Sequence, residues 1–135
     1  MANRLYKQFQ GTLEAGIVKL FGSVATSTSG TIASATGKGL TITKTAGETG
    51  RYTVALADPY VSFLSASIVV QGAADAAYTT AKGLVAFIRG VDVTSQTAPL
   101  LYVQFCDSDG SPADAELEDG AKFFIEVTLK NSTTY

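Results

Sequence analysis

The sequence contains no histidine, no tryptophan and a single cysteine, Cys106, in 135 residues. Without histidine and with one cysteine, the usual four-ligand zinc site cannot be assembled. A cysteine nucleophile would lack its usual activating base, and no intrachain disulfide can form. Because Cys106 ends the apolar run Leu100–Phe105, we interpret it as a small buried hydrophobic residue.

Charge is also scarce. Charged residues make up 16% of the chain and the formal net charge is −2, whereas a typical domain is about 25% charged. Nucleic-acid and anionic-membrane binding need a basic surface, so we expect neither partner. Two explanations of the low charge stay open: burial of the surface against other subunits, or a surface covered by Ser, Thr and Gly.

Long uninterrupted hydrophobic runs are missing as well. The most apolar region, residues 61–91, is interrupted by Gln71, Gly72, Asp75, Lys82 and Arg89, so we expect no membrane span there. The N-terminus lacks an apolar segment followed by a small-residue cleavage site. We therefore expect a protein that is made and used without Sec export.

What the sequence does contain is a two-residue alternation, clearest in residues 121–130. Its apolar set is Phe123, Ile125, Val127 and Leu129, and its intervening set is Phe124, Glu126, Thr128 and Lys130. Successive side chains of a strand point to opposite faces, so the pattern predicts a half-buried β-strand.

Similar patterns recur between Gly-, Ser- and Pro-containing turns. They predict a strand partly buried on both faces over Leu13–Val24, an edge strand near Ile32 within 25–39, a hairpin of 40–45 with 51–57, and strands over 65–71, 84–89 and 100–106. Tyr60–Leu64 is interpreted as a short helical turn, and Gly90 as the end of a strand. Most aromatic residues lie at alternating or strand-end positions, where core packing is expected.

About eight short strands without a long helix predict an all-β fold. The predicted architecture is a single-domain antiparallel β-sandwich or jelly-roll-like domain over residues 13–135, with an extended arm over residues 1–12. The arm carries Arg4, Leu5, Tyr6, Lys7 and Phe9. Two aromatic residues and a leucine are unsuited to a frayed terminus, so we expect these five residues to dock on their own domain or on a neighbouring subunit.

The densest group of polar residues is the acidic stretch 107–120, with six carboxylates. Asp107 and Asp109 begin like a calcium loop, but Pro112 intrudes and the spacing of an EF-hand loop is not met. A solvated hairpin loop is the favoured interpretation. Glu116 and Glu118 form a possible glycosidase pair, which the absence of tryptophan disfavours. We expect no enzyme, no catalytic residue, no cofactor and no metal.

Three stretches carry a family resemblance. The opening Met-Ala-Asn-Arg-Leu-Tyr-Lys-Gln-Phe resembles the start of small virion proteins of tailed bacteriophages. Residues 50–60, followed by Phe63 and Leu64, are similar to a second stretch of that family. Val103–Asp107, with the acidic turn leading to Leu129–Ser132, is similar to a third.

The resemblance implies a capsid decoration, or cement, protein on the outer surface of the phage head, made in the host cytoplasm. Its implied partners are the major capsid protein and copies of itself, as a dimer or trimer, with no nucleic acid and no membrane. The alternative is a head-fibre or tail adhesion module that binds a host surface glycan. The resemblance carries no catalytic residues.

Overall fold

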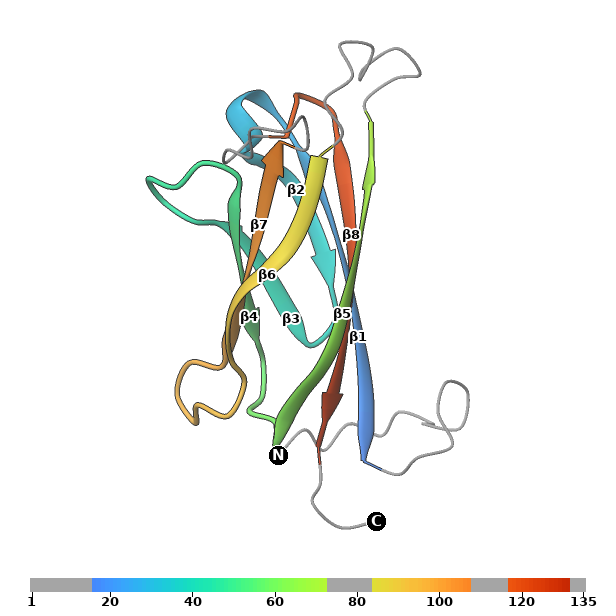
Figure 1. The fold of residues 1–135 in the computed structure, drawn as a ribbon, viewed down its shortest axis with the longest axis vertical. Helices are drawn as coiled ribbons and strands as arrows, with labels where there is room; N and C mark the ends of the chain where they lie inside the picture. Colours follow the sequence, from blue (N-terminus) through green and yellow to red (C-terminus); the bar gives the residue numbers. More distant parts are fainter. Residues whose placement is uncertain (1–15, 73–83, 108–116, 132–135) are drawn as a thin grey trace.

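The computed structural model describes residues 16–72, 84–107 and 117–131 (Figure 1). No helix in these ranges is long and apolar enough to cross a bilayer. The elements are β1 (Ile17–Thr26), the 3-10 turn η2 (Thr28–Gly30), β2 (Ile32–Gly37), β3 (Leu40–Lys44), β4 (Arg51–Leu56), β5 (Ser62–Gln71), β6 (Leu84–Asp92), β7 (Leu100–Asp107) and β8 (Lys122–Lys130).

The strands form two four-stranded sheets that pack face to face. Sheet A has the order β2-β1-β8-β5 and sheet B the order β3-β4-β7-β6. Every pair of neighbouring strands is antiparallel. The predicted antiparallel β-sandwich is therefore confirmed for the described residues, as are the hairpin of β3 with β4 and the edge position of β2.

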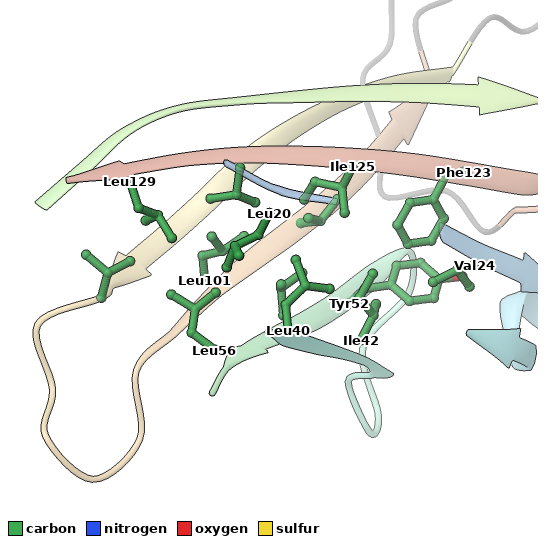
Figure 2. Packing of buried hydrophobic residues seen from close by; sticks show 14 of the residues in the cluster. Leu20, Val24, Leu40, Ile42, Tyr52, Leu56, Leu101, Phe123, Ile125 and Leu129 are labelled. Atoms are coloured by element: carbon green, nitrogen blue, oxygen red, sulfur yellow. The ribbon is translucent and has the colours of Figure 1, made fainter. Parts of the chain in front are cut away.

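The alternation seen in the sequence decides which side chains enter the core. Phe123, Ile125, Val127 and Leu129 of β8 are all buried, as the pattern predicts. On the facing sheet, Tyr52, Val54 and Leu56 of β4 are buried in the same way. In Figure 2, Phe123 and Ile125 from sheet A and Tyr52 and Leu40 from sheet B reach into one apolar layer.

Three aromatic rings join the sheets at one end of this layer. Tyr52 packs against Phe105 and Phe123 with ring centroids 5.8 and 5.0 Å away, and Phe105 lies 5.2 Å from Phe123. The Tyr52 hydroxyl donates a hydrogen bond to the carbonyl of Gly30, which has a positive φ of 67°. One side chain thus fills the core and also holds η2 in place.

Two predicted boundaries are wrong. Tyr60–Leu64 is not a helical turn, because β5 begins at Ser62 and the N–H of Val61 already donates to the carbonyl of Lys130 on β8. Gly90 does not end β6, which continues to Asp92 through a β-bulge between Ile88 and Gly90. A bulge inserts an extra residue without ending the ladder, and alternation alone does not reveal it.

Three burial expectations are also corrected. Cys106 is half-buried rather than buried, because it points to the outer face of sheet B opposite Val85. The first strand is described from Ile17, and residues 13–15 of the predicted strand lie outside the described ranges. The prediction that this strand is partly buried on both faces holds only in part, because Ser23 and Ala25 of its outer face are half-buried whereas Phe21 is 60% exposed. Leu117, from the predicted acidic loop, is buried in the core.

Adjacent phenylalanines on β8 allow a direct test of the sandwich. Phe123→Ala should lower the free energy of unfolding by about 3–5 kcal/mol, because it leaves a cavity beneath Tyr52 and Phe105. Phe124→Ala, on the opposite face of the same strand, should cost less than about 1 kcal/mol. Urea denaturation of both variants measures the difference, and equal midpoints would contradict the assigned orientation of β8.

Candidate docking surfaces

The sequence-predicted site residues lie mostly outside the described ranges. Arg4, Leu5, Tyr6, Lys7 and Phe9 of the arm fall there, as does Asp109. Asp107 is the last residue of β7, half-buried and paired in register with Leu84. Among residues 16–72, 84–107 and 117–131, no three His, Cys, Asp or Glu side chains gather closely enough to hold a metal ion.

The outer face of sheet A instead carries large exposed hydrophobic side chains. Phe21 of β1, Val69 of β5 and Phe124 of β8 are 60%, 59% and 42% exposed. The register places Phe124 between Ser23 and Val69, and Phe21 beside Glu126, the next outward residue of β8. We call Phe21, Val69 and Phe124 the apolar patch. Exposed clusters of this kind mark interaction surfaces.

The apolar patch borders a shallow open hollow of about 350 Å³. Its lining side chains include Phe21, Ser23, Thr36, Ser67, Val69, Phe124 and Glu126. The hydroxyls of Ser23 and Thr36 are hydrogen-bonded at 2.6 Å. The Glu126 carboxylate forms an ion pair with Lys19 at 3.2 Å. The hollow therefore combines two aromatic rings with hydroxyl groups and one carboxylate.

Sheet B also exposes apolar side chains on its outer face. Val85 and Phe87 of β6 are both exposed, and they lie opposite Cys106 and Gln104 of β7. Because the two outer faces point away from each other across the sandwich, the molecule presents apolar side chains on opposite sides.

Gln104 occupies an outward position on β7 and is nevertheless completely buried. Its Nε2 donates to the carbonyls of Thr49 and Phe105 at 2.9 and 3.1 Å. Its Oε1 accepts from Nη1 of Arg89 at 3.2 Å and from Nε of Arg51 at 3.4 Å. Two guanidinium groups thus cover one neutral amide and satisfy its hydrogen-bonding groups.

The two guanidinium groups that contact the Gln104 amide differ in their surroundings. Arg51 lies 3.6 Å from the Glu48 carboxylate and its guanidinium stacks 5.9 Å from the Tyr102 ring centre. Arg89 is an exposed residue placed by the β6 bulge. A carboxylate of a docking protein would find a charge-assisted donor here. Nothing in the local sequence signals this cluster, because Arg89 and Gln104 meet only through strand pairing.

Comparison of the chain with family models, with curated proteins and with solved structures finds no match. Neither the apolar patch nor the Gln104 cluster was foreseen from the sequence. The one visible signal was Phe124, which interrupts the polar set of the β8 alternation.

Replacing the buried amide tests the Gln104 cluster. Gln104→Met should lower the free energy of unfolding by about 1–3 kcal/mol, because the buried Phe105 carbonyl and the partly buried Thr49 carbonyl lose the side-chain donor. Gln96→Met, at an exposed position of the β6–β7 loop, is the matched control and should change stability by less than about 0.5 kcal/mol. Thermal or urea unfolding provides the measurement. A Gln104→Met variant as stable as the control would contradict the structural importance of this network.

Proposed function

We propose that the protein is a non-enzymatic virion structural protein that decorates and stabilises a phage capsid by bridging capsid subunits. The observation that carries the proposal is the exposure of large apolar side chains on the outer faces of both sheets. Surfaces of this kind are stabilised when another protein covers them. The resemblance of the N-terminal residues to small phage virion proteins supplies the proposed partner, the major capsid protein.

The arrangement of these side chains suits a bridging role. A sandwich with apolar groups on two opposite faces can contact two neighbours at once without changing shape. Full burial of a side chain such as Phe or Val contributes roughly 1.5–3 kcal/mol, so each contact is weak. Weak contacts repeated over a shell add strongly when geometry lets them form together.

The arm over residues 1–12 is proposed as an additional contact. Its residues Leu5, Tyr6 and Phe9 supply apolar groups, and Arg4 and Lys7 supply positive charge. Twelve residues span at most about 40 Å when extended, which is enough to reach an adjacent subunit. Placement on the outer surface of the head, and a dimer or trimer as the decorating unit, belong to the same proposal.

Binding to heads that lack the protein tests this function. Deletion of residues 1–10 should abolish cosedimentation with the heads while the sandwich keeps its thermal unfolding transition. In the full chain, Phe21→Ser with Phe124→Ser should weaken binding by at least about tenfold, since apolar burial is lost. Lys122→Ser, exposed on the same face of β8, is the control and should bind normally.

Electron microscopy of labelled particles provides the second readout of this experiment. We expect label on the head surface. Label on the tail, or normal binding by both the deletion and the patch variant, would refute the decoration proposal.

The second candidate, a head-fibre or tail adhesion module for a host surface glycan, is favoured by the hollow on sheet A. Aromatic rings beside hydroxyls and a carboxylate offer apolar contact and hydrogen bonds to one ligand. If this function holds, the chain should bind host surface polysaccharide in a pull-down assay. Glu126→Gln should then abolish glycan binding without affecting cosedimentation with heads. Absence of glycan binding by the unaltered chain would remove this candidate.

A further inference from the structure

The two lateral sides of the sandwich are not equally closed. Where β2 and β3 lie at the edges, the inward residues Leu40 and Ile42 of β3 are only 5% and 4% exposed, and Ile32 of β2 is half-buried. Where β5 and β6 form the edges, the inward apolar residues are only partly buried. We call these residues the open side: Phe63, Ala66, Ile68 and Val70 of β5, with Leu84, Ala86 and Ile88 of β6. Figure 1 shows β5 in green and β6 in yellow.

Beyond its first few residues, the edge strand β5 carries none of the usual protection against pairing. It pairs with β8 on one side, and in the described part of the chain no strand pairs with its other side. Its ten residues, SFLSASIVVQ, include no charge and no proline. Its bulge falls between Phe63 and Ser65, which leaves Ser65–Gln71 regular. Natural edge strands are normally blunted by charges, prolines or bulges.

The other three edges differ from β5. β6 contains Arg89 and Asp92 as well as a bulge in its second half, and β3 ends in Lys44. β2 is uncharged, but it has only six residues, and its inward positions carry one half-buried apolar side chain, Ile32, beside Ala35 and Gly37. Among the four edge strands of the described residues, only β5 combines a long neutral edge with several half-buried apolar side chains on its inward face.

We propose that β5 pairs antiparallel with β5 of a second copy, so that sheet A continues across a two-fold axis and the two open sides cover each other. A two-fold interface requires a self-complementary surface. The neutral Ser65–Gln71 segment meets this requirement, because pairing it with itself brings no like charges opposite each other. Main-chain hydrogen bonds would join the strands, and the inward residues Ala66, Ile68 and Val70 would gain apolar neighbours.

A second copy suits this edge better than the chain's own first twelve residues. In an added strand, one face of the arm would present Leu5, Lys7 and Phe9, and the other Arg4, Tyr6 and Gln8. Either face would bring a cation to the apolar open side, where burying an unpaired charge is unfavourable. The β5 segment presents only neutral groups. The biological setting of this pairing rests on the proposed function. The pairing adds to that function the surface through which copies associate.

Sedimentation equilibrium of the free, full-length protein is the first test. The unaltered chain should form a dimer at micromolar concentration. Ser65→Lys with Ser67→Lys, both at outward exposed positions of β5, should weaken the dimer at least about tenfold while the far-UV spectrum stays the same. Ser34→Lys, exposed on the β2 edge, should leave the dimer intact. A monomeric unaltered chain, or a double variant that dimerises normally, would overturn the pairing.

Cysteine crosslinking gives a second, independent readout. Three variants each combine Cys106→Ala with one new cysteine: Ser65→Cys, Ser67→Cys or Val69→Cys. Each purified variant is oxidised alone and in a mixture with each of the others. Paired strands bring opposite residues within disulfide reach, so at least one combination should give a covalent dimer, and Ser34→Cys should give none. If no combination crosslinks, or if a monomeric chain protects from hydrogen exchange the Ser65–Gln71 amides that point away from β8, another segment covers β5 and the proposal fails.

Both tests use free protein without heads. A chain that dimerises through β5 yet does not bind heads would refute only the decoration function. Head binding by a monomeric chain would refute the pairing and the dimeric or trimeric decorating unit, but not the decoration of the head itself.

Discussion

The whole structure depends on one constraint, the burial of one face of each sheet against the other. Because side chains alternate along a strand, burying one face leaves the other outside. The contacts among Tyr52, Phe105 and Phe123 show how closely the inner faces approach. The residues that a strand contributes to the core therefore determine which of its other residues lie on the outer face of the sheet, where a partner could contact them.

This constraint explains how much the sequence revealed. Alternation within one strand is local information, so the β8 core positions and the β3–β4 hairpin were predicted correctly. Bulges are not visible in that pattern, which is why the extension of β6 beyond Gly90 was missed. The start of β5 was misplaced because Val61 enters the ladder through a hydrogen bond to Lys130, a contact between residues distant in sequence.

The candidate surfaces were harder to predict for the same reason. Phe21, Val69 and Phe124 come from three strands and become neighbours only through the register of β1 and β5 on β8. Within its own strand, each of these residues resembles a core residue or a single exception to the apolar–polar alternation. The buried Gln104 likewise depends on Arg51 and Arg89 from the two flanking strands. The arm and Asp109 lie outside the described residues, so their predicted roles stay predictions.

The low charge of the chain is visible on two parts of its described surface. β2 exposes Ala, Ser and Thr, whereas the outer faces expose Phe and Val. Val69 belongs to the apolar patch and also to the neutral edge strand β5. A partner strand on that edge would extend the surface on which the patch lies, so association at the edge and docking at the face would be coupled. Coupling of this kind favours a protein that works as an assembled unit, because each contact then enlarges the surface available to the next.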